Sequence, residues 1–176
     1  MNRFATLAIT FLLVLLFVIS CGQKKTKEQL YAEAKRYEQD EKLEQAIKTF
    51  EQLVDNYPDA SNVDSVLFRI GQIYSNNLTD FANSVKTHAR LIKQCPDSRL
   101  AGQSLFMIGY HYANNINDLD SAKVYYEKFV EKYPDNELVN SVKWELEHLG
   151  QDINDIDFLK IESPKKLIPQ IKLQPQ

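Results

Sequence analysis

Residues 67–81 read LFRIGQIYSNNLTDF, and residues 105–119 read LFMIGYHYANNINDL. The two stretches lie 38 residues apart and share their leucine, phenylalanine, isoleucine, glycine, tyrosine, asparagine and aspartate positions. The same offset separates three Pro-Asp pairs, which begin at Pro58, Pro96 and Pro134. A fixed period of this size indicates an array of structural repeats, each of which must stack on its neighbours to bury its apolar face.

Each copy of the repeat is predicted to form two helices. Apolar residues recur at helical spacing over residues 43–56, and the proline that follows prevents the helix from continuing. Asp80 and Asp118 precede the second helices of the next two copies, where a short polar side chain caps a helix. Gly71 and Gly109 occupy one register within first helices, which predicts a close approach between helices. The first helices are expected at about 28–41, 65–76 and 102–114.

These residues resemble the tetratricopeptide repeat, in which Leu-Gly, Tyr, Ala, an aromatic residue and Pro follow one another at set distances. The resemblance covers residues 27–150 and implies an all-α fold, an α-solenoid of about three helical hairpins with a C-terminal capping helix. The 38-residue unit is longer than usual, with one extra residue between Gly71 and Ser84 and about three after each proline. In this it is similar to bacterial envelope proteins, namely the repeat lipoprotein of the β-barrel assembly machine and the Tol–Pal-associated periplasmic protein.

The organisation expected from these patterns has seven segments. They are a lipoprotein signal peptide (1–20), a lipidated cysteine with its tether (21–27), three repeats (28–60, 61–98 and 99–136), a capping helix and turn (137–157), and an extended tail (158–176). The tail contains three prolines, so it is expected to be disordered, although its apolar residues leave open that it packs along the array or docks a partner.

The first twenty residues resemble a bacterial export signal. Residues 4–19 carry no charge, follow Arg3 and are too few for a spanning helix. Val18-Ile19-Ser20-Cys21 resembles a lipobox, which implies cleavage before Cys21 and acylation of that residue, palmitate being one of the chains. The absence of Asp after Cys21 resembles an outer-membrane address, facing the periplasm. The alternative is an uncleaved signal anchor in which Cys21 is incidental.

The composition and the missing motifs argue against nucleic-acid binding and against enzyme activity. The formal charge of −3 is too small and too mixed for a nucleic-acid surface. No HExxH, CxxC, phosphate loop or nucleophile elbow is present, and the three histidines are widely spaced. We therefore expect no enzyme activity, no catalytic residue, no cofactor, no metal and no small-molecule substrate.

By the resemblance, one face of the first helices forms a concave surface that binds protein partners. Two positions per repeat point into it, an aromatic one and a second that is often polar: Tyr31 and Lys35, Phe68 and Gln72, Phe106 and Tyr110, Trp144 and His148. Large aromatic side chains dominate binding hot spots, so this ladder would suit a peptide or helix of a partner. The alternative is that the rings only pack between stacked helices.

Two function classes remain open. The first is a lipid-anchored scaffold of the cell envelope that takes part in outer-membrane assembly or in a division-linked complex. The second is an accessory module that recruits or regulates an envelope enzyme such as a peptidoglycan hydrolase.

Overall fold

The computed structural model describes residues 24–151, so the predicted signal peptide, Cys21 and the extended tail lie outside the described residues. Within this range the chain forms seven α-helices and two π-helical turns, without a strand. The prediction of an all-α fold built from helical hairpins is confirmed. None of the described helices is long and apolar enough to cross a membrane.

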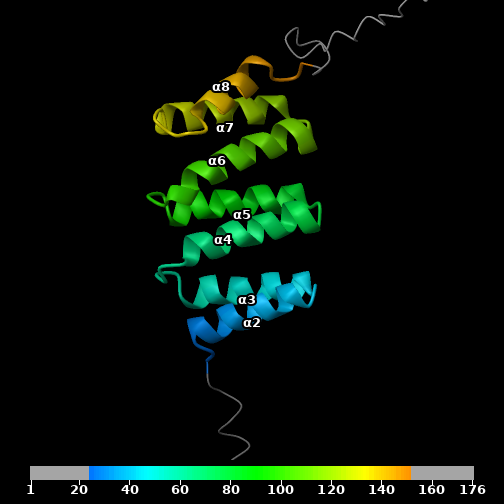
Figure 1. Cartoon of the computed structure of the whole chain (residues 1–176), viewed down its shortest axis with the longest axis vertical. Helices are drawn as coiled ribbons and strands as arrows, with labels where there is room; N and C mark the ends of the chain where they lie inside the picture. The colour runs from blue at the N-terminus through cyan, green and yellow to red at the C-terminus, as the bar shows by residue number, and fades with distance from the viewer. Residues whose placement is uncertain (1–23, 152–176) are drawn as a thin grey trace, which may run out of the picture. The chain divides into compact units, whose positions relative to one another are not determined.

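The chain divides into two compact units, of residues 1–104 and 105–176, with the boundary inside helix α6. In the first unit α2 packs against α3 and α4 packs against α5, which gives two antiparallel hairpins (Figure 1). The elements that begin in this unit are α2 (Lys27–Gln39), α3 (Leu43–Asn56), α4 (Val63–Gln72), η1 (Ile73–Asn77), α5 (Phe81–Gln94) and α6 (Arg99–His111).

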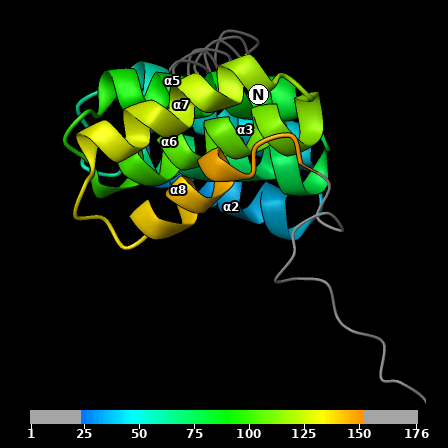
Figure 2. The ribbon, with the colours of Figure 1, turned by 90° about the horizontal axis from the view of Figure 1, so that it is seen from above.

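The second unit contains the end of α6, the turn η2 (Tyr112–Ile116), α7 (Leu119–Lys132) and α8 (Val139–Glu147). Helix α7 packs against both η2 and α8 (Figure 2). Tyr126 and Phe129 of α7 are fully buried, as is Val142 of α8. Helix α8 therefore belongs to the core of this unit, as expected of a capping helix.

The core of the first unit comes from the stripes that the sequence places at helical spacing. Phe50, Leu53 and Val54 of α3 are completely buried, and so are Leu67 and Ile70 of α4. Burying an aliphatic or aromatic side chain of this size contributes roughly 1.5–3 kcal/mol. The packing of these hairpins thus accounts for the apolar periodicity of the repeat.

The extra residue of the longer repeat is absorbed in a π-helical turn. Helices α4 and α6 each pass into a five-residue π-turn, η1 or η2, and neither turn has a counterpart after α2. A π-turn closes its hydrogen bonds from i to i+5, as Leu78 N–H does with Ile73 C=O at 3.1 Å. It therefore accommodates one more residue than an α-helical turn. The expected helices 65–76 and 102–114 end as α-helices at Gln72 and His111 for this reason.

The close approach predicted at the two glycines is confirmed. A Cβ atom on Gly71 would lie 2.7 Å from Nε2 of His88, and one on Gly109 would lie 2.6 Å from the ring of Tyr126. Neither distance can be tolerated without movement of the facing ring. The aromatic position of the second helix thus packs directly onto the glycine of the first.

The turn between the two helices of each repeat contains one residue in the left-handed conformation. These residues are Glu41 (φ 58°), Thr79 (φ 52°) and Asn117 (φ 60°), spaced 38 residues apart like the Pro-Asp pairs. Asp80 and Asp118 follow, and the side chain of each accepts a 3.0 Å hydrogen bond from the backbone N–H three residues later. The predicted caps are therefore confirmed in the second and third repeats.

Candidate partner-binding site

The start of the described chain is held against the first hairpin. Thr26 caps α2, and its partner in the capping box is Gln29. The Tyr57 hydroxyl donates a 2.8 Å hydrogen bond to the carbonyl of Lys25, whose ammonium pairs with Glu33 at 2.5 Å. Helix α2 begins at Lys27, one residue before the expected start of the first repeat.

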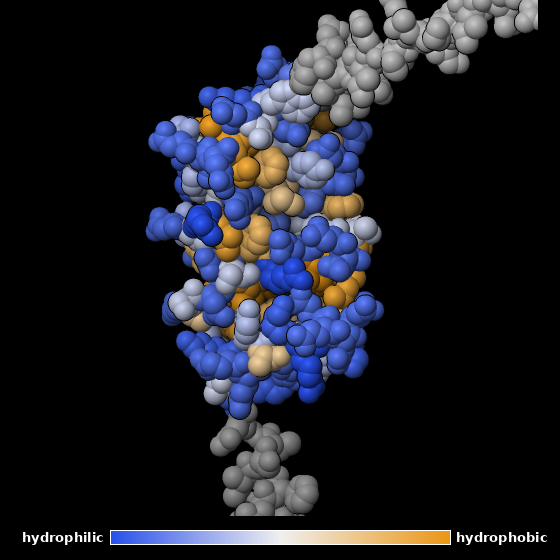
Figure 3. All heavy atoms as spheres, in the orientation of Figure 1, coloured by the Kyte–Doolittle hydropathy of each residue, from blue (hydrophilic) through white to orange (hydrophobic). Residues whose placement is uncertain are grey.

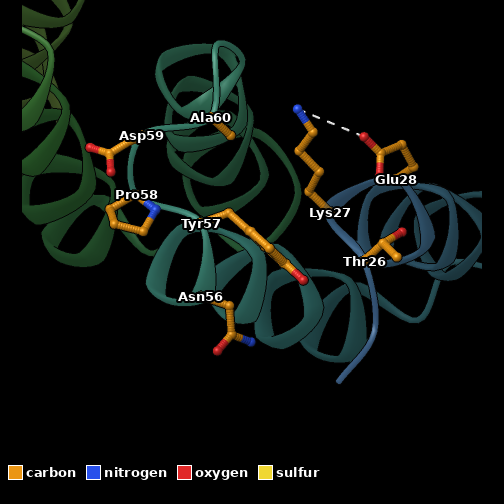
Figure 4. A pocket seen from close by; sticks show the side chains of 8 residues that line it. All are labelled: Thr26, Lys27, Glu28, Asn56, Tyr57, Pro58, Asp59 and Ala60. Carbon is orange, nitrogen blue, oxygen red and sulfur yellow. Dashed lines mark ion pairs between the residues drawn. The ribbon is translucent and has the colours of Figure 1, made fainter. Parts of the chain in front are cut away.

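A pocket of about 520 Å³ opens where the chain enters α2. Figure 4 shows the Tyr57 side chain extending from the end of α3 toward Thr26, with Lys27 and Glu28 paired at 3.7 Å nearby. The Pro58-Asp59 turn forms the other wall. This end of the first unit is the one that adjoins the expected anchor at Cys21.

The two aromatic rungs of the first unit differ in exposure. Tyr31 on α2 is 42 % exposed and tilts over Phe50, with ring centroids 5.9 Å apart. Phe68 on α4 is partly buried against the core, and its ring meets the buried His88 edge-on at 5.2 Å. Tyr31 is therefore accessible, whereas Phe68 packs between helices.

The polar positions of the first unit join one charge cluster between α2 and α4. Glu38 pairs with Lys35 at 2.8 Å and with the Arg69 guanidinium, which also donates to Gln72 at 3.3 Å. Burial opposes ionisation of Glu38, but the hydrogen bonds from Arg69 and Lys35 outweigh it and hold its pKa below the ordinary value. The charges of the cluster are therefore paired within the protein, although the buried Arg69 Nε has no hydrogen-bond partner there.

In the second unit three of the predicted residues line one pocket of about 530 Å³. Tyr110 of α6 is 39 % exposed, and the Trp144 ring of α8 stacks on His148 with centroids 4.5 Å apart. The complete lining is Tyr110, Ala113, Asn114, Asn117, Leu119, Trp144, Glu145, His148, Leu149, Gly150 and Gln151. The fourth predicted residue, Phe106, stacks instead on buried Tyr126 with centroids 6.2 Å apart.

Glu145 is a member of this pocket that the sequence did not single out. Burial raises its pKa, and interactions with the Tyr126 hydroxyl and with His148 offset this only in part. The Tyr126 hydroxyl is buried beside this carboxylate, and burial together with Glu145 raises its pKa. No lysine or arginine among the described residues forms an ion pair with Glu145.

The repeat register is the signal that could have found this residue. Glu145 follows Trp144 as Arg69 follows Phe68 and Met107 follows Phe106, one repeat apart each time. The aromatic ladder positions alone do not point to the next position along the chain. At that position the residue changes from arginine through methionine to glutamate in successive repeats. Such a change of charge at one register indicates that the position faces different surroundings in each copy.

The face seen in Figure 3 carries small groups of apolar side chains between polar ones. Interaction sites of folded proteins often combine exposed rings with a polar surround in this way.

Residues 23–154 match the family model described as YfiO, outer membrane lipoprotein. No curated protein matches the chain. The matched range covers about three quarters of the chain and includes every described helix, from α2 to α8. The chain therefore belongs to the YfiO family of outer membrane lipoproteins, and its repeats are of the tetratricopeptide type.

Proposed function

We propose that this protein is a lipid-anchored scaffold that binds other envelope proteins through exposed rings on its first helices and acts in outer-membrane assembly or a division-linked complex. The observation that carries the proposal is the exposure of Tyr31 and Tyr110, which are 42 % and 39 % exposed at two of the predicted positions. A large aromatic ring in water is unfavourable unless a partner covers it, which is why such rings mark binding surfaces.

The anchor proposed at Cys21 would hold the first hairpin close to the membrane. Lys24 lies three positions after Cys21, so an extended chain would span at most about 10 Å between them. Because Tyr57 binds the backbone of Lys25, the Pro58-Asp59 turn would lie near the lipid headgroups. A spin label at Asp59 should then sense reconstituted lipid, whereas one at Asn77, beyond the other end of α4, should not.

Anchoring is tested by replacing the cysteine. Cys21→Ser should release the protein from membranes, and Cys95→Ser is the matched control because it removes the other cysteine. Mass spectrometry of the mature wild-type protein should find acyl chains on Cys21. An unmodified Cys21 would contradict the anchor without touching the proposal of partner binding.

Partner binding is tested by purification from detergent-solubilised membranes. Wild type should retain envelope proteins, and Tyr31→Ala or Tyr110→Ala should lose them while remaining folded. Recovery of barrel-assembly or division proteins would support the scaffold. Recovery of a cell-wall hydrolase whose activity changes with binding would instead support an accessory module.

A further inference from the structure

The pocket of the second unit contains one carboxylate that no lysine or arginine among the described residues pairs with. Among its lining residues Glu145 is the only carboxylate, and no lysine or arginine lines the pocket. A partly buried carboxylate is disfavoured in its charged form unless a cation or several donors face it. Its described neighbours are the Tyr126 hydroxyl and His148, and burial still prevails over both.

The first unit shows how the same register is satisfied when a cation is present. Arg69 occupies the position of Glu145 in an earlier repeat and pairs with Glu38, whose pKa is lowered. In the first unit the charge of Arg69 is thus balanced by a carboxylate of the same unit. In the second unit no lysine or arginine among the described residues pairs with Glu145.

The remaining walls of the pocket suit the stem and head of a basic side chain. Tyr110 and Trp144 present ring surface, and Asn114 and Asn117 provide amide oxygens. Cations bind favourably over such rings, and the methylene stem of lysine or arginine packs on apolar surface. The His148 ring stacks on one face of Trp144, and both side chains line the pocket.

We propose that this pocket receives a lysine or arginine side chain of a partner protein, with its charged head on Glu145 and its stem between Tyr110 and Trp144. This rests on the proposed function and gives it a recognition element. Charge complementarity argues for this occupant, because the pocket combines a carboxylate with aromatic walls and contains no lysine or arginine.

The single tryptophan of the chain makes the test specific. Trp144 lies in the pocket, so intrinsic tryptophan fluorescence reports on this site alone. The mature chain, residues 21–176 with Cys21→Ser, is titrated with the blocked peptides Ac-Ala-Ala-Lys-Ala-Ala-NH₂, its arginine analogue and its norleucine analogue. We expect saturable changes with the lysine and arginine peptides at about millimolar concentration, and none with norleucine.

Glu145→Gln should weaken binding about tenfold or more, since a charge-assisted contact is lost. Glu147→Gln is the matched control, because Glu147 is exposed on the same helix and does not line the pocket. Equal binding of norleucine, or equal losses in both variants, would overturn the proposal. Thermal melting of both variants establishes that they are folded.

A shortened chain separates the partner from the protein's own tail. Gln151 lies at the pocket and the residues after it include several lysines. If a chain ending at Gln151 binds the lysine peptide while the full mature chain does not, the occupant is the tail and the partner proposal fails. If the wild-type protein binds the lysine peptide but retains no envelope protein in the co-purification, that result would count against the proposed function and not against the pocket.

Discussion

Arg69 in the first unit and Glu145 in the second occupy the same place in the repeat and carry opposite charges. Arg69 is joined to Glu38 and Gln72, so its charge is balanced within the fold. Glu145 lies in a pocket with two aromatic rings and has a raised pKa because burial opposes its ionisation. A repeat therefore preserves the backbone position of a residue without preserving its role, since the role depends on neighbouring side chains.

The largest expected effects concern the two phenylalanine rungs, each of which packs against a buried ring of the second helix of its repeat. Phe68→Ala and Phe106→Ala should each lower the free energy of unfolding by about 3 kcal/mol, because each ring lies partly buried against another ring. Tyr31→Ala and Tyr110→Ala should cost about 1 kcal/mol, since these rings are more exposed. Urea denaturation measures all four. Equal losses would show that the tyrosines are structural as well.

The glycine contacts test whether helix approach is equally tight in the two units. Gly71→Ala and Gly109→Ala should each destabilise the fold by about 1–3 kcal/mol through overpacking against His88 and Tyr126. Combining Gly109→Ala with Tyr126→Leu should recover part of the lost stability, because the new Cβ atom would collide with the Tyr126 ring. A double-mutant cycle from chemical denaturation provides the measurement. Simple additivity would mean that the contact is relieved elsewhere.

The left-handed turn residues allow an exchange between the units. Thr79 is β-branched and has a positive φ, whereas Asn117 tolerates the same conformation. Thr79→Asn should therefore stabilise the protein by about 1 kcal/mol, and Asn117→Thr should destabilise it by about as much. Thermal melting of each variant beside wild type should show a higher melting temperature for Thr79→Asn and a lower one for Asn117→Thr. Shifts of the same sign would show that side-chain contacts outweigh backbone strain.

The smallest expected effect distinguishes the two charged positions. Glu145→Gln should stabilise the fold slightly at neutral pH, by about 0.5 kcal/mol or less, because the raised pKa of Glu145 means that its charged form opposes folding. In wild type, the contribution of the Glu145 carboxyl to the free energy of unfolding is fully favourable below its pKa in the unfolded chain. This contribution is lost as the pH rises through the higher pKa of the folded protein. Melting temperatures measured from about pH 4 upward should converge in the glutamine variant and wild type at the acidic end.

A stabilising Glu145→Gln that also loses basic-peptide binding would identify a carboxylate retained for recognition at the expense of stability. Arg69→Met places the residue of Met107 at the equivalent site and should instead destabilise the first unit by at most about 1 kcal/mol, as expected for a partly exposed ion pair. Stability changes of opposite sign in these two variants would support the contrast between the two positions, and changes of the same sign would contradict it.

By itself the sequence determined the repeat, its period, the helical hairpins and the caps at Asp80 and Asp118, because these follow from local propensity and apolar spacing. It also located Gly71 and Gly109 as contact points. The extra residue of each longer repeat was visible, but its conversion into η1 and η2 was not, since a π-turn and a longer loop have the same length.

Only the tertiary structure decided which ladder residues are surface and which are core. Tyr31 and Tyr110 are exposed while Phe68 and Phe106 rest on His88 and Tyr126, although all four fit the concave register. The pocket around Glu145 depends on α6, η2 and α8 coming together, and the balance of charge there depends on burial. Burial and charge pairing arise from contacts between distant residues, and for that reason a repeat pattern alone cannot specify them.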